Sequence, residues 1–577
     1  MRPSPRIRCS ITTEMSLLIN ALVNLFRLLR NAYVRAFRRP PDFVWIPVTG
    51  SLPEFEPPKL GFVRRRLDPR PSPPSLEGIR GRLDRVLADG RVRGVILRVE
   101  NLDAGWAVLE ELRIELHRFR QAGKRVATYL TDPGTSSYYL ALAGDEIFAS
   151  PLSTLNVVGL RMRVNFLKDS LESLGLKTEV FAVSPYKSAA DPFSRSDFTK
   201  ESREQAERLL ERRFGQLISA ISTGRDIPPG EVRSLIDHAP YPATEAVRKG
   251  LLDGALYEDE LSENLSDGEE SARLAEWGMA KKALRVPYRR RTHKKLVGVV
   301  RVAGAIVRGR SRRLPVPVPL IGREQAGSDS VVATLRAAEK SRRIGAILLH
   351  VDSPGGDALA SDLIWREVER IRQKKPIVVL MGNVAASGGY YVSAAANLIV
   401  ARNNTITGSI GVILARPVAA GLFGKLKINP VAIERGARSN LLDLRRPPTT
   451  DEITVLNEQL QNFYGGFKAR VEQGRKLQPD ALEEMAGGRV WTGVEALERN
   501  LVDEVGGLRA AVEKARELAG IPGGLPDVLI KLSPPRNARP TPGEPVREAV
   551  EAMHAAFSEL ATTRVWALAP YEIFEDW

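Results

Sequence analysis

The sequence predicts an α/β protein in which two tandem domains arose by internal duplication and follow an amphipathic N-terminal helix. Short β-branched runs, such as 95–99 and 347–351, alternate with helical stretches, as is typical of βα units around a mostly parallel sheet. The segment GTSSYY at 134–139 recurs as ASGGYY at 386–391, 252 residues later. A chain of 577 residues with 43% hydrophobic content can bury more than one core, which agrees with a duplicated domain.

The first 45 residues are expected to form a basic amphipathic segment that associates with a membrane surface. The apolar run 16–26 is shorter than the ~20 residues that cross a bilayer. Arginines follow it at near-helical spacing with apolar residues between them, which favours a surface rich in anionic lipid. A helix docked on its own protein or on a partner chain is the alternative. A secretory signal is disfavoured because the charges follow the apolar run.

Segments of biased composition separate the two repeats from the rest of the chain. A proline-rich stretch at 52–75 indicates an extended connector near the start of the first repeat. A stretch that begins acidic and ends basic indicates a linker between the repeats, and a Pro/Gly-rich stretch follows the second. The predicted organisation is a membrane-associating segment at 1–45, a first repeat at 46–262, a linker at 263–294, a second repeat at 295–525 and a C-terminal tail at 526–577.

The formal net charge of +16 does not by itself indicate a nucleic-acid partner. The arginines are spread along the chain, and there is no zinc-finger, RNP-like or basic-zipper pattern, so we expect no nucleic acid to bind. A single cysteine, Cys9, excludes an intramolecular disulfide framework and a cysteine-based zinc site. The five histidines lack ligand-like spacing and no Walker motif is present. We therefore expect neither a metal nor another cofactor.

The second repeat places a serine where a nucleophile would lie. The strand predicted at 346–351 ends in DSPGG, where Gly355 and Gly356 let a substrate approach the backbone and offer N–H groups to an anion. The next strand leads to Ser387 at a strand-to-helix turn, where the N–H of Gly388 can stabilise an oxyanion. A packing or phosphate-binding role for a glycine-flanked serine is the alternative.

A nucleophilic serine needs a base, and histidine is a poor candidate in this chain. His350 lies within an apolar strand, where a core role is expected. The first repeat offers Lys187, which follows an apolar strand between small residues. Partial desolvation there would lower the lysine pKa and leave a neutral amine able to accept the serine proton. The first repeat has Thr135 in place of the serine and the second has no matching lysine, so we expect a composite Ser–Lys site.

Five motifs carry a resemblance to a known family: VDSPGGDA, GNVAASGGYY, NNTITGSIGV, GRVWTGVEALERNLVDEVGG and SPYKSAADPF. In their order and spacing along the chain, where SPYKSAADPF comes first, they resemble the signal peptide peptidase A (SppA) family in its long, tandem form, over roughly residues 80–510. The resemblance implies a ClpP/crotonase-like fold and a membrane-associated serine protease that degrades leftover signal peptides. It implies Ser387 as nucleophile, Lys187 as general base and Ser409 as the residue that orients the lysine. It assigns the oxyanion N–H groups to Gly388 with Gly355 or Gly356.

The resemblance also bears on partners and location. It implies peptide substrates, contact with membrane lipid and assembly into a homo-oligomer, a tetrameric ring. It also implies association with a bacterial plasma membrane, and the sequence does not indicate on which side of that membrane the protein lies. We therefore expect a serine endopeptidase that cleaves short apolar peptides at a membrane. A crotonase-type enzyme acting on acyl thioesters and a catalytically inactive membrane scaffold are the alternatives.

Overall fold

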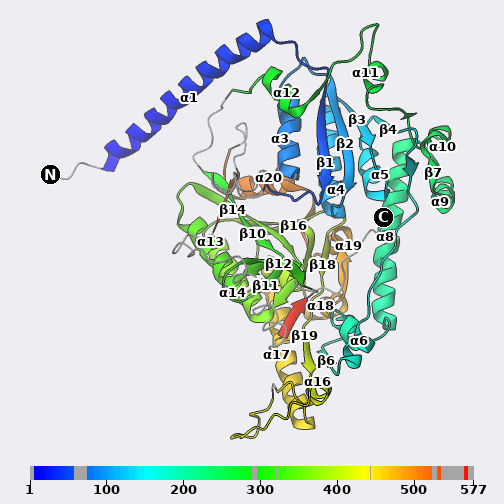
Figure 1. Cartoon of the computed structure of the whole chain (residues 1–577). Helices are drawn as coiled ribbons and strands as arrows, with labels where there is room; N and C mark the ends of the chain where they lie inside the picture. Colours follow the sequence, from blue (N-terminus) through cyan, green and yellow to red (C-terminus); the bar gives the residue numbers. More distant parts are fainter. Residues whose placement is uncertain are drawn as a thin grey trace. The chain divides into compact units, whose positions relative to one another are not determined.

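The computed structural model describes residues 5–56, 74–288, 295–318, 322–441, 443–522, 529–533 and 565–568. These residues fall into two compact units, whose elements Figure 1 shows in the colours of the sequence. The first unit comprises the described residues of Met1–Leu160 and Arg212–Thr292. The second unit comprises those of Arg161–Glu211 and His293–Phe574.

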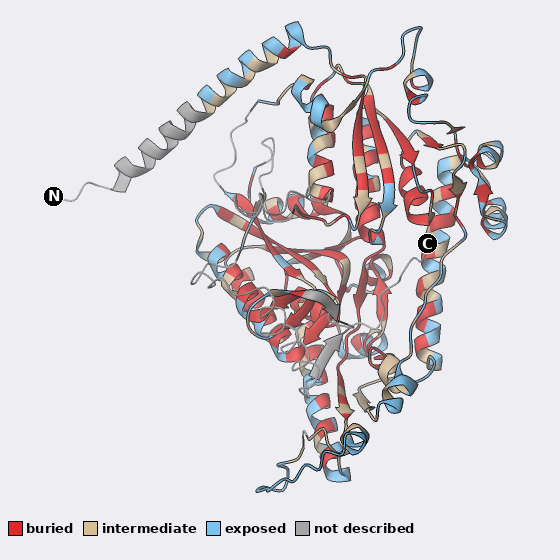
Figure 2. Cartoon of the chain, viewed as in Figure 1, coloured by how far each residue is buried: buried red, intermediate tan, exposed pale blue. Residues whose placement is uncertain are grey.

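The first unit is built on a six-stranded sheet in which every neighbouring pair is parallel. The strands lie in the order β8-β4-β3-β2-β1-β9. Their bounds are Phe43–Gly50 for β1, Gly94–Leu102 for β2, Arg125–Leu130 for β3, Glu146–Ala149 for β4, Gly254–Ala255 for β8 and Leu274–Glu276 for β9. The central strands are nearly continuous apolar runs because parallel sheets of this class are covered on both faces. Figure 2 shows these strands largely buried.

The main sheet of the second unit repeats this strand order. Strands β21-β17-β16-β14-β10-β22 follow one another as neighbours, and all of these pairs are parallel. Strands β18 and β20 extend the sheet beside β16. The bounds are Leu296–Ala303 for β10, Ile344–Ser353 for β14, Ile377–Ala386 for β16, Leu398–Ala401 for β17, Ile406–Gly408 for β18, Val490–Thr492 for β20, Glu504–Val505 for β21 and Leu529–Lys531 for β22.

The duplication is visible in side-chain contacts as well as in strand order. The hydroxyl of Tyr138 donates to the carbonyl oxygen of Leu251 at 2.7 Å. In the second unit the hydroxyl of Tyr390 donates to the carbonyl oxygen of Leu501 at 2.8 Å. Both tyrosines are fully buried, so each hydroxyl needs such a partner inside the core. The predicted α/β class and the two tandem copies are therefore confirmed.

The second unit contains a further, seven-stranded sheet that joins distant parts of the chain. Its order is β12-β13-β11-β15-β23-β19-β6. The bounds are Lys177–Ala182 for β6, Ala305–Val307 for β11, Arg312–Val318 for β12, Gly322–Gly327 for β13, Gly355–Asp357 for β15, Ile413–Val418 for β19 and Val565–Leu568 for β23. A two-stranded sheet in the first unit pairs β5, Thr154–Leu155, with β7, Tyr241–Pro242.

Helices cover the sheets of both units. In the first unit they are α1 (Pro5–Phe37), α3 (Leu76–Leu87), α4 (Trp106–Gln121), α5 (Thr135–Ala141), α9 (Pro229–Asp237), α10 (Ala243–Arg248), α11 (Leu261–Asn264) and α12 (Trp277–Ala283). In the second they are α6 (Lys168–Ser173), α7 (Asp191–Ser194), α13 (Ser328–Lys340), α14 (Ala358–Arg372), α15 (Gly388–Ser393), α16 (Ala420–Lys425), α17 (Thr450–Arg475), α18 (Pro479–Met485), α19 (Gly493–Glu498) and α20 (Leu508–Leu518). Helix α8, Lys200–Arg225, has residues in both units.

Several helices begin where the sequence supplies a side-chain cap. Ser75 accepts a hydrogen bond from the backbone at the start of α3, and Asp357 does so for α14. Thr449 and Thr492 each form a capping box with the glutamate three residues later, at the starts of α17 and α19. These caps satisfy N–H groups that the first helical turn leaves unpaired.

The compact units do not follow the predicted boundaries of the two repeats. Residues 161–211 were expected within the first repeat at 46–262, yet they belong to the second unit. The physical reason is the antiparallel pairing of β6 with β19, in which six residues from Lys177 to Ala182 pair with Ile413–Val418. This pairing brings the segment that follows β6, which contains Lys187, into the second unit.

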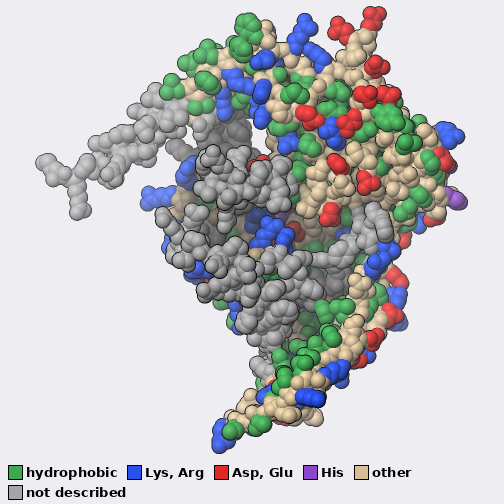
Figure 3. All heavy atoms as spheres, in the orientation of Figure 1, with side chains coloured by type: hydrophobic (Ala, Val, Ile, Leu, Met, Phe, Trp, Pro, Cys, Tyr) green, Lys and Arg blue, Asp and Glu red, His purple; other side chains and the backbone are tan. Residues whose placement is uncertain are grey.

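Helix α1 is amphipathic, but its arginines do not all face solvent. Arg27 donates to the carbonyl oxygen of Pro287 at 2.7 Å and Arg30 to that of Leu284 at 3.1 Å, both within the first unit. Apolar side chains on the opposite side of the helix are exposed and recur every three or four residues: Leu22, Leu25, Phe26, Leu29, Tyr33 and Phe37. Figure 3 shows apolar side chains along the described part of this helix. Among the described residues no helix combines the length and apolarity needed to span a bilayer.

Candidate active site

Ser387 lies at the sharp turn between β16 and α15. Its backbone has φ 53° and ψ −114°, a conformation that is costly for any residue with a Cβ. The turn is held because the N–H of Ser387 donates to the carbonyl oxygen of Gly408 at 2.7 Å, and the N–H of Tyr391 donates to that of Ser387 at 2.8 Å. The serine is fully buried. The strained backbone of Ser387 is therefore held from both sides at the start of the helix.

Glycines surround the serine because the backbone segments approach too closely for larger residues. A Cβ on Gly388 would lie 2.7 Å from the hydroxyl oxygen of Ser361 and 3.1 Å from the backbone nitrogen of Gly356. A Cβ on Gly356 would collide with the carbonyl oxygen of Ile306. Gly355 has φ +109°, which a side chain rarely permits. The three glycines identified in the sequence therefore lie together beside Ser387.

Lys187 reaches the serine from the segment that follows β6. The N–H of Val183 donates to the carbonyl oxygen of Val412 at 3.4 Å, which continues the pairing of β6 with β19. The hydroxyl of Ser184 then donates to the carbonyl oxygen of Gly487. A Cβ on Gly488 would lie 2.8 Å from the Cα of Lys187, so this glycine makes room for the lysine backbone.

The structure brings Lys187, Ser387 and Ser409 together in the second unit. The Nζ of Lys187 lies 2.6 Å from the Oγ of Ser387 and 2.9 Å from the Oγ of Ser409. It also lies 2.9 Å from the carbonyl oxygen of Ser409. Lys187 is 1% exposed, and both serines are fully buried. All three partners of the amine are uncharged oxygens, so none of them compensates a positive charge as a carboxylate would.

Burial holds the pKa of Lys187 well below its ordinary value, because desolvation disfavours the ammonium form. An open hollow of about 1040 Å³ lies beside the lysine and is lined by residues that include Ala182, Ser184, Asp191 and Phe198. Burial also raises the pKa of Asp191 to about 6, with Arg195 acting in the opposite direction. The second unit thus has a desolvated amine, a hydroxyl within hydrogen-bonding distance of it and an open hollow beside the amine.

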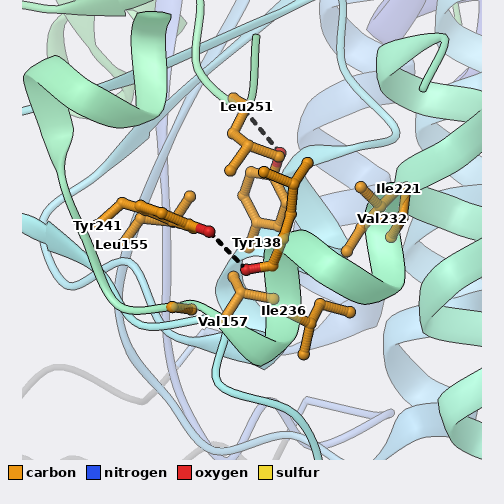
Figure 4. Close-up of a pocket in the computed structure, with 10 residues that line it drawn as sticks. Tyr138, Leu155, Val157, Ile221, Val232, Ile236, Tyr241 and Leu251 are labelled. Carbon is orange, nitrogen blue, oxygen red and sulfur yellow. Dashed lines mark hydrogen bonds between the residues drawn. The ribbon is translucent and has the colours of Figure 1, made fainter. Parts of the chain in front are cut away.

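The corresponding place in the first unit has none of this geometry. Gly134 caps helix α5 with φ −90°, and Thr135 begins the helix where the second unit has its strained serine. The cavity in Figure 4 lies nearby and is lined by Tyr138, Leu155 and other apolar side chains. Its volume of about 10 Å³ is no more than a packing gap. Within the described ranges of both units, no group of three or more His, Cys, Asp or Glu side chains could hold a metal.

Sequence reasoning missed one segment that the structure brings to the site. Strand β23, Val565–Leu568, comes from the predicted tail at 526–577 and pairs with β15 and β19. The only signal in the sequence is the run VWAL, whose residues are strand-forming or apolar and which is followed two residues later by a proline. A run of four residues is too short for its pattern to predict a strand.

Comparisons with known proteins match the chain to two protease families and to several relatives. The family described as "Peptidase family S49" matches residues 118–271 and 369–522, and "Clp protease" matches residues 320–406. The chain is 34% identical over 466 residues to "Serine protease SPPA, chloroplastic" of Arabidopsis thaliana, which covers 78% of this chain and 67% of the relative. It is 29% identical over 452 residues to "Protease 4" of Haemophilus influenzae, covering 74% and 71%.

A shorter relative matches part of the chain: "Putative signal peptide peptidase SppA" of Enterococcus faecium is 33% identical over 199 residues, 34% of this chain and 58% of the relative. The family matches confirm the two tandem ClpP-like domains and the resemblance to the long form of SppA. They also confirm that the protein is a serine-type peptidase. The chain belongs to peptidase family S49.

Proposed function

We propose that the protein hydrolyses peptide bonds through an acyl-enzyme on Ser387, with Lys187 as the general base. The observation that carries the proposal is the 2.6 Å separation between the Nζ of Lys187 and the Oγ of Ser387 in a buried setting. Hydrogen-bonding distance is the first requirement for a base and its nucleophile. A lowered lysine pKa, caused by burial, meets the second requirement, because only the neutral amine can accept a proton.

A neutral amine accounts for all three contacts of Lys187. It has two N–H donors and one lone pair. The carbonyl oxygen of Ser409 can only accept, so one N–H is directed to it. The second N–H can be directed to the Oγ of Ser409, and the lone pair then accepts the O–H of Ser387. Ser409 in this arrangement positions the amine and does not take part in bond making.

The proposed reaction proceeds in two halves. The hydroxyl proton of Ser387 passes to Lys187 as the serine oxygen bonds to the peptide carbonyl carbon. The lysine then gives this proton to the leaving amine as the C–N bond breaks, which leaves an ester on the serine. A water molecule repeats the sequence: it loses a proton to Lys187, attacks the ester, and the proton returns to Ser387 as the acid leaves. In each half, Lys187 must be neutral when it accepts the proton and protonated when it gives the proton up.

The N–H groups of Gly388 and Gly356 are the proposed oxyanion donors. The sequence left Gly355 and Gly356 as equal candidates for the second donor. The N–H of Gly355 donates to the hydroxyl of Ser353 at 3.2 Å, which engages it inside the loop. The nitrogen of Gly356 lies beside the Cβ position of Gly388, so these two N–H groups can converge on one oxygen.

The proposed substrates are extended, apolar peptides, including signal peptides left after cleavage from their precursors. A relative named as a putative signal peptide peptidase supports this class of substrate. The exposed apolar stripe of α1 supports action at a membrane surface, because such a stripe is suited to the boundary between lipid headgroups and acyl chains. We also propose that the protein associates with a bacterial plasma membrane and that it assembles into a homo-oligomer, a tetrameric ring.

A variant pair tests the proposed function. Ser387→Ala removes the nucleophile, and Thr135→Ala makes the same class of change at the matching position of the first unit. Cleavage of a synthetic leucine-rich signal peptide should fall to background in the first variant and stay at the wild-type level in the second. Peptide cleavage by Ser387→Ala at the wild-type rate would contradict the proposal. Turnover of an acyl thioester that does not depend on Ser387 would favour a crotonase-type enzyme.

A further inference from the structure

A short turn of sequence Gly-Gly-Arg, residues 487–489, joins α18 to β20 in the second unit. The motif GRVWTGVEALERNLVDEVGG begins within it, and the proposed reaction gives this motif no role. Gly487 and Gly488 have φ of 67° and 89°, values that a side chain rarely permits, so the backbone of the turn needs glycine at both positions. The N–H of Gly487 donates to the hydroxyl of Tyr464 at 3.1 Å, which fixes the turn to α17.

The glycines of this turn contact the segment that carries Lys187. The hydroxyl of Ser184 donates to the carbonyl oxygen of Gly487. A Cβ on Gly488 would lie 2.8 Å from the backbone nitrogen, the Cα and the Cβ of Lys187. The backbone of the lysine therefore lies directly against the turn, and its position depends on where the turn is held.

Arg489 contacts the same segment through its side chain. Its guanidinium carbon lies 4.1 Å from the centre of the Tyr186 ring, and both residues are half-buried. Within the described ranges Arg489 forms no ion pair, so the ring is the partner of its charge there. A planar guanidinium over an aromatic face is an attractive contact. Tyr186 directly precedes Lys187, so this contact acts on the backbone one residue from the base.

The backbone of the same turn holds Ser409. The N–H of Ser409 donates to the carbonyl oxygen of Arg489 at 2.6 Å, and the N–H of Gly488 donates to the carbonyl oxygen of Ile410 at 2.8 Å. Ser409 has φ 51°, a conformation that is costly for a residue with a Cβ, and these bonds hold it there. The turn thus contacts the segment that supplies the amine and the segment that supplies two of its three hydrogen-bond partners.

We infer that Arg489 is a positioning residue for Lys187: it stacks on Tyr186 while its carbonyl oxygen binds Ser409, and so fixes the segment of the base against that of Ser409. The inference rests on the proposed function and adds to it a residue that takes no proton itself. A lysine side chain has a flexible four-carbon stem. Its backbone must therefore be held firmly if the Nζ is to stay 2.6 Å from the Oγ of Ser387.

Peptide-cleavage kinetics of Arg489→Gln and Tyr186→Leu test the inference, because both changes remove the stacking contact and leave the backbone of the turn in place. Each should lower kcat about twofold to thirtyfold with KM unchanged, as expected for one lost cation–π contact. The double variant should lose no more than the weaker single variant, because both remove the same contact. Arg489→Lys should lose less than Arg489→Gln, since an ammonium can also lie over the ring. Arg233→Gln, which breaks an arginine contact with Phe214 in the first unit, should keep the wild-type kcat.

The pH dependence of kcat/KM separates positioning from a purely structural role. Burial causes the low pKa of Lys187, so a looser segment that admits water should raise this pKa. The midpoint of the pH profile should then move to higher pH in both single variants. A fall in kcat with an unmoved midpoint would overturn the inference, because the contact would then be structural only. If Arg489→Gln does not fold, Tyr186→Leu tests the same contact.

The outcome for Lys187→Met separates this inference from the proposed function. Wild-type kcat and pH midpoint in both Arg489→Gln and Tyr186→Leu, with Lys187→Met inactive, would overturn the inference and leave the proposed function intact. Peptide cleavage by Lys187→Met at the wild-type rate would contradict the proposed function, and the inference with it.

Discussion

Replacing Lys187 by methionine should abolish activity and stabilise the fold at the same time. Methionine fills a similar volume and carries no charge, so it suits a fully buried position. Burial lowers the lysine pKa below its ordinary value of 10.5, which means that the folded protein must release a proton that the unfolded chain retains. This release costs free energy at any pH below 10.5, and methionine removes the cost.

The sign and the slope of this effect follow from linkage. Between the lowered folded pKa and 10.5, the unfolded chain binds one more proton at this site than the folded protein. The wild type therefore loses about 1.4 kcal/mol of stability for each pH unit below 10.5, until the pH reaches the folded pKa. The advantage of Lys187→Met should grow by the same amount per unit as pH falls from 10 towards the folded pKa.

Urea unfolding of wild type and Lys187→Met at pH 8, 9 and 10 measures this difference, with the exposed Lys340→Met as the control. The control replaces a lysine that is exposed to solvent, and it should leave peptide cleavage at the wild-type level. Peptide cleavage by Lys187→Met should fall at least a hundredfold, the lower end of the range for a lost general base. A stability difference that is flat from pH 8 to 10 would refute the reasoning, because it would mean that the buried lysine stays protonated.

Three further predictions concern the oxyanion donors, the positioning serine and the N-terminal helix. Gly356→Ala should lower kcat by about 10²–10³ because its Cβ would collide with a backbone carbonyl and displace the N–H donor, whereas Gly90→Ala, in open space, should leave peptide cleavage unchanged. Ser409→Ala should lower kcat roughly tenfold with KM unchanged, since it removes one hydrogen bond of ~1–2 kcal/mol from the amine; a changed KM alone would contradict a positioning role. Phe26→Asp changes a side chain that is 72% exposed, so it should abolish flotation with anionic vesicles without altering the melting temperature. Flotation equal to that of the wild type would count against a lipid-facing helix.

Much of the fold could be predicted because its signals are local or repeated. The β-branched runs of β2 and β14 are nearly continuous apolar stretches, interrupted by Arg98 and His350, and parallel strands buried on both faces require such stretches. Aligning the duplicated tyrosine segments pairs Thr135 with Ser387. This alignment shows which of the two copies carries the serine. The glycines beside it were recognisable because close backbone approach leaves no room for another residue.

The unpredicted features depend on pairings between distant segments. The sequence assigned Lys187 to the first repeat, whereas β6 pairs with β19 more than 230 residues away and takes the lysine into the second unit. No local pattern encodes such a partner. The same holds for β23, whose four residues gain their place from β15 and β19 and not from any periodicity of their own.

Helix α1 is an element that the sequence predicts, although the face that it turns to the protein could not be predicted. Its alternation of arginine and apolar residues correctly predicts an amphipathic helix. Which face meets the protein depends on the carbonyl oxygens near residues 281–287, because these accept hydrogen bonds from Arg27 and Arg30. The sequence alone linked the arginines to anionic lipid at a membrane surface, whereas in the structure two of them bind the first unit and an apolar stripe is exposed.

The rate at which a fluorophosphonate labels Ser387, measured against pH in wild type and Lys187→Met, tests the central claim most directly. Labelling requires the serine to lose its proton to a base and does not depend on the choice of peptide. We predict a single adduct on Ser387 by mass spectrometry, a rate that rises with pH to a plateau reached below 10.5, and almost no labelling of Lys187→Met. Labelling of Lys187→Met at the wild-type rate, or an adduct on another residue, would contradict the account.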